Sequence, residues 1–511
     1  MELAAPVSAE RHEHERDRRR ALALGVLRGQ AVQRREEPVH ERGIRLDGLL
    51  TRGSAQVGGA EKSHVRVEVL TEQIEPEPAA PVRPLGGRAI RALLRAGLGA
   101  ADLAVEFRRH GETLQPRADI CQTRRELAAN LPRAETRLLQ WPPMRGLWRA
   151  VLDEVAPYDA GKSLEAIAKD LGIEDLIRLS ANESPLGPSP RAIEALRREA
   201  PRAHLYPDGG STQLRAMLGE RLGVPASWLM AGNGADELLA LIARAAYDPG
   251  DEILVPHPAF EPYGTEAILS GATVVSSPLQ GYETDLEDMQ RRVTPRTKAV
   301  IICTPHNPAS TIVLRPRLER LIGSLGGDPP LVILDEAYRD FCDDPETADG
   351  VDFVRRHPTV IALRTFSKIA GLAGLRIGYA IARPEAIERL NRVRAPYNVN
   401  RLAQVAAAAA LEDKEHLERT RAVILAERPR LRNALEARGA PSPPSQANFL
   451  LVRVGDRASA IRQGLLEAGI LVRDGAGVGF PGHLRIAIGT PAQNNRLLAA
   501  WDQATKQQSL R

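Results

Sequence analysis

Residues 364–376 read RTFSKIAGLAGLR and follow an apolar run at 359–363, which predicts a strand that ends in a glycine-rich loop. Lysine is rare in this chain, which has seven lysines among its 69 lysines and arginines, so Lys368 is unusual at this place. A desolvated primary amine can lose its proton and attack a carbonyl carbon, which an arginine cannot do. Arg376 is a fixed cation suited to a phosphate, and the two glycines before it let the backbone approach a ligand closely. The stretch therefore predicts a covalent site for a carbonyl compound, against the alternative of a solvated lysine on a surface loop.

The composition of the whole chain narrows the class of protein. Its 511 residues have room for two to four domains, and no apolar run approaches the roughly 18 residues of a membrane span. The first residues lack the cationic and then apolar pattern of a secretory signal. Cys121, Cys303 and Cys342 are too scattered for a disulfide framework or a metal pair, and a net charge of +4 is too weak to indicate nucleic acid. We therefore expect a cytoplasmic protein with no metal site, no membrane segment and no nucleic-acid partner.

Residues 1–143 differ in composition from the rest of the chain. They hold two of its 19 aromatic residues, and residues 72–81 read as a linker rich in proline and glutamate. A short helix is expected at 89–98, but the region has too few apolar residues to bury a core of its own. We predict a low-order extension, or a translation start placed too far upstream of Met144. The alternative is a DNA-binding domain fused to the body of the protein.

Two apolar runs in the middle of the chain end in polar residues. Residues 299–303 read AVIIC and residues 331–334 read LVIL, and such runs alternating with helices predict a parallel sheet buried on both faces. Asn307 comes shortly after the first run and Asp335 directly after the second. Ligands bind at the carboxyl ends of parallel strands. We therefore expect Asn307, Asp335 and Lys368 to meet in one site.

Three further stretches are candidates for contacts with a ligand. Residues 232–237 read GNGADE and precede an apolar helix, so free N–H groups there favour a phosphate, although the same residues serve as plain helix caps. Phe260 follows a strand at 252–256 and either stacks on a flat ring or belongs to the core. Residues 180–190 read SANESPLGPSP, which is either a rigid connection or the wall of a substrate pocket.

The order of the elements changes after residue 396. Two helices are followed by strands at 448–452, 470–473 and 484–489 with helices between them, which indicates a small α+β domain. Arg473 and Arg485 lie on two of these strands, where a lone arginine is usually solvated.

Residues 144–505 closely resemble the histidinol-phosphate aminotransferases, a family of class II aminotransferases that depend on pyridoxal 5'-phosphate (PLP). The resemblance implies fold type I, an α/β fold with a large, mostly parallel sheet and a small α+β domain. It is carried by residues 180–190, YPDGG at 206–210, residues 232–237, DEAY at 335–338, Ser367-Lys368 with Arg376, PYNVN at 396–400, Arg473 and Arg485. With these motifs we expect an extension over 1–143, an arm with part of the small domain over 144–200, a large PLP-binding domain over 201–395 and a small domain over 396–511.

The resemblance also implies a role for each candidate residue. Lys368 would bind the aldehyde carbon of PLP and shuttle the proton, while Asp335 would keep the ring nitrogen protonated so that the ring accepts electrons. The other implied contacts are Asn307 and Tyr338 at the ring hydroxyl, Phe260 on the ring face, Ala235, Asp236, Ser367 and Arg376 at the phosphate, Tyr206 at the phosphate of the neighbouring subunit in a homodimer, and Arg473, Arg485 and Asn182 at the substrate.

The implied reaction is transamination between histidinol phosphate and 2-oxoglutarate, giving imidazole-acetol phosphate and glutamate in histidine biosynthesis. Alternatives on the same fold are an aromatic-amino-acid aminotransferase and a phospho-amino-acid decarboxylase. A PLP-sensing transcription regulator using residues 1–143 is the alternative of another class. The chain departs from the family at two places: Ser184 stands where asparagine is common, and residues 306–310 read HNPAS where Asn-Asn-Pro-Thr-Gly is usual.

Overall fold

The chain forms two compact units, Met1–Met144 and Arg145–Arg511, in a computed structural model. The described residues are 53–56, 64–70, 104–109 and 112–113 as backbone, then 146–157, 163–173 and 175–509, with side chains up to residue 506. No helix in these ranges is long and apolar enough to cross a membrane.

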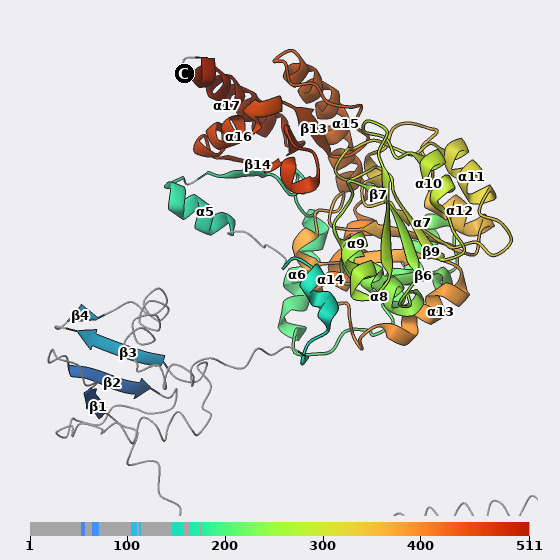
Figure 1. Cartoon of the computed structure of the whole chain (residues 1–511), viewed down its shortest axis with the longest axis horizontal. Helices are drawn as coiled ribbons and strands as arrows, with labels where there is room; N and C mark the ends of the chain where they lie inside the picture. Colours follow the sequence, from blue (N-terminus) through green and yellow to red (C-terminus); the bar gives the residue numbers. More distant parts are fainter. Residues whose placement is uncertain are drawn as a thin grey trace, which may run out of the picture. The chain divides into compact units, whose positions relative to one another are not determined.

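The first unit contains a small antiparallel sheet in the order β1-β2-β3-β4 (Figure 1). These strands were not predicted, although Val65, Val67 and Val69 alternate with polar residues in the period of two that is typical of a strand. The expected helix at 89–98 and the rest of the low-order extension lie outside the described residues, so both stay predictions. The strands are β1 (Gly53–Gln56), β2 (His64–Leu70), β3 (Ala104–Arg109) and β4 (Glu112–Thr113).

The second unit is built on a seven-stranded sheet in the order β6-β12-β11-β10-β9-β7-β8. All neighbouring pairs from β11 to β8 run parallel, and β12 runs antiparallel to both of its neighbours. The prediction of an α/β fold with a mostly parallel sheet is confirmed. The strands are β6 (Leu229–Gly232), β7 (Glu252–His257), β8 (Thr273–Pro278), β9 (Thr297–Cys303), β10 (Leu331–Asp335), β11 (Val360–Thr365) and β12 (Gly378–Ile381).

Helices cover both faces of this sheet (Figure 1). Alternate residues of β9 enter different hydrophobic clusters, Val300 and Ile302 in one and Ile301 and Cys303 in the other. Both faces of the strand are therefore buried, which explains its unbroken apolar sequence. One face is covered by α8 (Gly234–Ala246), α9 (Pro262–Leu269) and α13 (Pro384–Val393), and the other by α7 (Thr212–Leu222), α10 (Leu286–Arg292), α11 (Arg315–Gly323) and α12 (Gly350–Arg356).

A second sheet of four strands has the order β13-β15-β14-β5. Its edge strand comes from the opposite end of the unit, because Ile177 of β5 pairs in parallel with Ile470 of β14. The residues before the large sheet therefore complete the sheet that follows it. The strands are β5 (Ile177–Leu179), β13 (Phe449–Arg453), β14 (Ile470–Asp474) and β15 (His483–Ala487).

The remaining helices lie before and after the large sheet in the sequence. Asn400 starts one of them by accepting a hydrogen bond from the amide of Ala403, which satisfies one free N–H of the first turn. The α-helices are α5 (Leu164–Leu171), α6 (Pro190–Glu199), α14 (Arg401–Glu412), α15 (Lys414–Glu436), α16 (Ala458–Glu467) and α17 (Pro491–Ser509). Short 3-10 helices are η2 (Ala150–Glu154), η3 (Ala200–Arg202), η4 (Ala226–Trp228), η5 (Arg339–Phe341), η6 (Ala373–Leu375), η7 (Gly455–Arg457) and η8 (Ala476–Val478).

Candidate active site

Three neighbouring parallel strands bring their carboxyl ends together. Asp335, the last residue of β10, pairs in register with Cys303 of β9 on one side and Leu363 of β11 on the other. Asn307 lies in the loop after β9, and Lys368 lies in the loop after β11. The site is built around this edge of the sheet, where side chains from different parts of the sequence can meet one ligand.

Lys368 places a primary amine at this edge. Its Nζ donates a hydrogen bond of 3.2 Å to the carbonyl of Ala181 and lies 5.5 Å from the centre of the Tyr338 ring. Burial, with the nearby guanidinium of Arg485, lowers its pKa to about 8. Near neutral pH, a larger fraction of the Lys368 amine is therefore neutral than in an ordinary lysine.

Asp335 is a buried carboxylate held by two donors. Its Oδ2 accepts a hydrogen bond of 2.5 Å from the hydroxyl of Tyr263, and its Oδ1 accepts one of 3.0 Å from the amide of Ala337. Burial raises the pKa of Asp335, and the two donors oppose that rise. Within the described ranges Asp335 forms no ion pair, so it can receive a cationic N–H group from a ligand.

Tyr263 was not predicted as a site residue. It is fully buried near the start of α9, and its ring meets the half-buried ring of Phe260 edge-on at 5.6 Å. The sequence HPAFEPY at 257–263 marks an aromatic pair after a strand, which could have drawn attention to it. No local pattern shows which carboxylate the hydroxyl would reach.

The start of α8 and the loop after β11 form a corner suited to an anion. Arg376 donates a hydrogen bond of 2.8 Å to Asp236 in the first turn of α8, beside Ala235. Gly234 has a φ of +83°, and an added Cβ there would lie 2.7 Å from the Arg376 guanidinium. Only glycine therefore fits this close approach. Ser367 lies in the same loop as Arg376 and is buried. Its hydroxyl accepts a hydrogen bond of 2.9 Å from Thr365.

A second group of polar side chains faces the same edge from the four-stranded sheet. Arg485 of β15 donates a hydrogen bond of 2.7 Å to Oδ1 of Asn307, and a second of 3.0 Å to the carbonyl of Ser180. Its Nε is buried and has no hydrogen-bond partner in the described part of the chain. Arg473 is exposed and lies directly opposite Arg485 in the register of β14 and β15. Burial and the charge of Arg473 lower the pKa of Arg485, so an anion between the two would be stabilised.

Asn182 and Tyr338 connect the two groups. The Nδ2 of Asn182 donates a hydrogen bond of 3.2 Å to the Tyr338 hydroxyl, and its Oδ1 is buried with no partner among the described residues. Burial raises the pKa of Tyr338 to about 12, so the phenol keeps its proton at neutral pH. A protonated phenol and an unpaired amide oxygen both remain available to a ligand.

Tyr206 does not join this cluster. It is 78% exposed, and its ring stacks on that of Tyr397 with 4.7 Å between the centres. Its carbonyl accepts a hydrogen bond from Arg401, and none of its described contacts is with the residues above.

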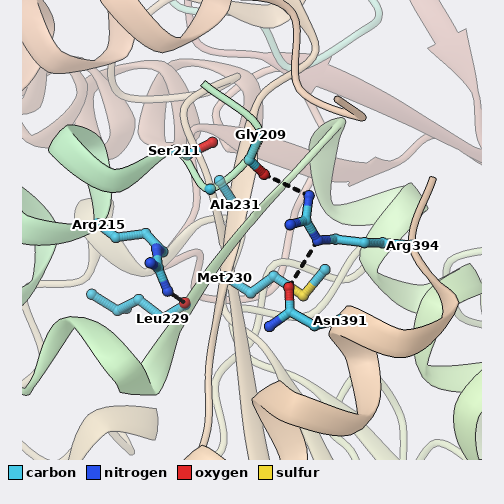
Figure 2. Close-up of a pocket in the computed structure, with 9 residues that line it drawn as sticks. Gly209, Ser211, Arg215, Leu229, Met230, Ala231, Asn391 and Arg394 are labelled. Carbon is cyan, nitrogen blue, oxygen red and sulfur yellow. Dashed lines mark hydrogen bonds between the residues drawn. The ribbon is translucent and has the colours of Figure 1, made fainter. Parts of the chain in front are cut away.

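A separate cavity of about 120 Å³ lies beside β6 (Figure 2). Arg394 borders it and donates hydrogen bonds to the carbonyl of Gly209 and to Oδ1 of Asn391. None of the predicted cofactor or substrate residues lines it. The lining residues are Gly209, Gly210, Ser211, Arg215, Leu229, Met230, Ala231, Asn391 and Arg394.

Comparisons with known proteins identify the family. The family model of class I and II aminotransferases matches residues 174–500. The histidinol-phosphate aminotransferase of Symbiobacterium thermophilum is 42% identical over 358 residues, covering 69% of this chain and 97% of that protein. The enzyme of the same name from Moorella thermoacetica is 42% identical over 355 residues, covering 69% of this chain and 91% of that protein.

A solved structure agrees with these sequence matches. The histidinol-phosphate aminotransferase of Sinorhizobium meliloti, in complex with pyridoxal-5'-phosphate, aligns with a TM-score of 0.65 and 27% identity over 72% of this chain and 99% of that one. The resemblance drawn from the motifs is confirmed. The chain belongs to the class I and II aminotransferases and, within them, to the histidinol-phosphate aminotransferase family.

Proposed function

We propose that the protein transfers an amino group between L-histidinol phosphate and 2-oxoglutarate with the help of PLP, giving imidazole-acetol phosphate and glutamate in histidine biosynthesis. The observation that carries the proposal is that two neighbouring parallel strands bring together Lys368 and Asp335. Lys368 has a lowered pKa and follows β11, and Asp335 is a buried carboxylate at the end of β10. The curated relatives support the substrate, because they bear the name of this reaction and the chain covers nearly their full length.

The side chains fit PLP at each of its functional groups. Lys368 supplies an amine for the aldehyde, and Asp335 supplies a buried carboxylate for the pyridine N–H, with no ion pair to any residue that the structure describes. The α8 start with Arg376 supplies N–H groups and a guanidinium for the phosphate. When bound, PLP supplies a ring that withdraws electrons from the substrate and so eases loss of its α-proton. The remaining proposed contacts are Asn307 and Tyr338 at the ring hydroxyl, Phe260 on the ring face, and Ala235, Asp236 and Ser367 at the phosphate.

The protein's own part in the reaction is to hold charge and to move a proton. Lys368, whose pKa is lowered to about 8, would take up a proton from the substrate carbon and return it, because a general base works best when its pKa lies near the working pH. Asp335 would offer its carboxylate to the ring nitrogen, and the hydrogen bonds from Tyr263 and the Ala337 amide favour its charged form by opposing the rise in its pKa that burial causes. Both roles depend on burial, which excludes water from the reacting atoms.

Arg473 and Arg485 are the proposed binding groups for the anionic end of the substrate, with Asn182 beside them. A pair of guanidinium groups binds either a phosphate or a carboxylate through two hydrogen bonds. The same pocket can therefore receive histidinol phosphate and glutamate in turn.

We further propose a cytoplasmic homodimer in which Tyr206 reaches the phosphate of the partner subunit. Tyr206 and Tyr397 form an exposed stacked pair, and Leu147 and Trp148 are also largely exposed, which is typical of a surface that a second subunit covers. Cys303 and Cys342 are free thiols, in keeping with a reducing compartment. The proposed domains remain 144–200, 201–395 and 396–511.

The test is rescue of a histidine auxotroph that lacks this transaminase, followed by an assay of the purified protein with histidinol phosphate and 2-oxoglutarate. We expect growth without histidine and turnover that depends on PLP. Failure to rescue, with faster turnover of phenylalanine or tyrosine, would instead support an aromatic-amino-acid aminotransferase. Release of carbon dioxide would support a decarboxylase.

A further inference from the structure

A buried histidine closes the loop that follows β9. His306 is 1% exposed, its amide donates a hydrogen bond of 2.7 Å to the Thr311 carbonyl, and its carbonyl accepts one of 2.6 Å from the Ser310 amide. Its imidazole turns back into the same loop, where Nδ1 accepts a hydrogen bond of 3.3 Å from the amide of Ala309. The side chain therefore caps the loop from within, as asparagine and aspartate side chains do in tight turns.

Backbone hydrogen bonds close this loop, but one of its residues has an unfavourable backbone conformation. Ser310 adopts a φ of +66°, in the left-handed region that disfavours residues with a Cβ. The family usually has glycine at this position, so the serine makes the conformation harder to keep. The hydroxyl of Ser310 is buried without a partner among the described residues and adds no support.

The loop presents the side chain of Asn307. This residue follows His306 directly, and its Oδ1 accepts the hydrogen bond from Arg485. A shift of the loop would move the amide group that is proposed to meet the ring hydroxyl and would also release a proposed substrate-binding arginine. Both contacts of Asn307, the proposed one with the ring hydroxyl and the one with Arg485, therefore depend on the conformation of the loop that His306 stabilises.

The protonation state of His306 suits an acceptor. Burial lowers its pKa to about 4, so the imidazole is neutral at neutral pH, and Nδ1 can accept while the proton sits on Nε2. The carbonyl of Pro258 lies near the ring and opposes the fall in the pKa of His306. In the described part of the chain, Nε2 of His306 has no partner of good hydrogen-bond geometry. Pro258 belongs to the loop that carries Phe260, so the ring of His306 lies between two loops of the site.

Resting on the proposed function, we propose that His306 is a positioning residue, whose imidazole fixes the loop that presents Asn307 to PLP and to Arg485. It touches neither ligand in this role. An asparagine at the same place, as is usual in the family, offers Oδ1 as the acceptor for the same amide. A buried histidine that merely fills space would instead be replaced by an apolar side chain of similar size without loss.

The experiment compares His306→Leu and His306→Asn with the wild-type full-length protein. The dissociation constant of PLP is measured by absorbance titration of the apoprotein, together with the circular dichroism of bound PLP, and kcat and KM for histidinol phosphate are measured separately. We expect His306→Leu to weaken PLP binding about tenfold, to reduce the dichroism and to raise KM, because one hydrogen bond is lost. His306→Asn should return all of these values to within about threefold of the wild type. His357→Leu is the matched control, because His357 stacks on Phe353 at the end of α12, away from the strand ends of the site.

The outcomes separate the two proposals. If His306→Leu binds PLP with wild-type affinity and dichroism, or if His306→Asn is as impaired as His306→Leu, the positioning role is wrong. If the wild-type protein itself fails to bind PLP or to transaminate, the proposed function is wrong instead. Should His306→Leu not fold, His306→Gln takes its place, because the longer side chain cannot put its oxygen where Nδ1 lies. Equal PLP affinity of the asparagine and glutamine variants would then overturn the role, and tighter binding by the asparagine variant would support it.

Discussion

The hydroxyl of Tyr263 donates a hydrogen bond of 2.5 Å to Oδ2 of Asp335, and both side chains are buried. The two residues lie 72 positions apart in the sequence, on α9 and at the end of β10. The bond leaves the other lone pairs of the carboxylate for the Ala337 amide and a ligand. Tyr263 thus fixes the direction of Asp335, and burial with the neighbouring charge raises the pKa of this tyrosine well above its usual value, so it stays a donor.

Tyr263→Phe should lower kcat about 10- to 100-fold, because a hydrogen bond to a charged group is lost. PLP should remain bound, since the carboxylate and the phosphate contacts are unchanged. The measurements are single-turnover kinetics and the absorbance spectrum of the bound cofactor. Tyr247→Phe is the matched control, because Tyr247 is also buried, at the end of α8. If Tyr263→Phe and Tyr247→Phe have equal kcat, Tyr263 does not contribute to catalysis.

Asp335→Asn should keep PLP bound and lower kcat by about 10²–10³-fold. A neutral amide cannot favour the protonated ring nitrogen, so the ring withdraws electrons less strongly. Turnover and PLP affinity are measured side by side on the same preparation. Near-normal turnover would show that Asp335 does not have this role.

Lys368→Ala should abolish the covalent bond between the protein and PLP. Borohydride reduction, followed by mass spectrometry of the peptides, should find PLP attached at Lys368 in the wild type and nowhere in the variant. Lys414→Ala, at the exposed start of α15, should keep the adduct and the yellow colour. An adduct that persists in Lys368→Ala would place the nucleophile elsewhere.

The rate at which the apoprotein captures PLP should rise with pH, with a midpoint near 8. The pKa of Lys368 is lowered from 10.5 to about 8, so its neutral amine forms as the pH passes 8. About one-tenth of the amine is then neutral at pH 7, far more than for an ordinary lysine. Arg485→Gln removes a charge that contributes to the lowering, so the midpoint should move to higher pH. Stopped-flow absorbance between pH 6 and 10 measures both, and a midpoint near 10 in the wild type would contradict the lowered pKa.

A protein of residues 145–511 should match the full chain in PLP affinity, subunit assembly and kcat. All the proposed site residues lie in the second compact unit, and the aminotransferase family model matches residues 174–500, within the same unit. Limited proteolysis of the full chain should leave a stable product that starts near Met144. If the full chain binds DNA sequence-specifically and the shorter protein does not, the result would favour a PLP-sensing transcription regulator over the proposed transaminase.

The sequence alone was enough to predict the parts of the fold that rest on local patterns. Apolar runs such as 299–303 predicted strands buried on both faces, and the polar residues that follow them predicted which edge carries the site. The reason is that strand periodicity and strand ends are properties of neighbouring residues. Asn307, Asp335 and Lys368 each follow a predicted strand, so the sequence also predicted that the three lie in one site.

Only the tertiary structure decided the contacts that join distant segments. The strands β1 to β4 were not predicted, and neither were the parallel pairing of Ile177 with Ile470, the hydrogen bond from Tyr263 to Asp335 or the cap by His306. In the strand pairing and in the bond from Tyr263 to Asp335, folding brings together segments that are far apart in the sequence, whereas the cap by His306 depends on the shape that the folded chain gives to one loop. Ser310 also keeps its left-handed backbone in a loop that other hydrogen bonds close. Hydrogen bonds of this kind depend on direction and distance in three dimensions, and a linear pattern of side-chain types contains neither.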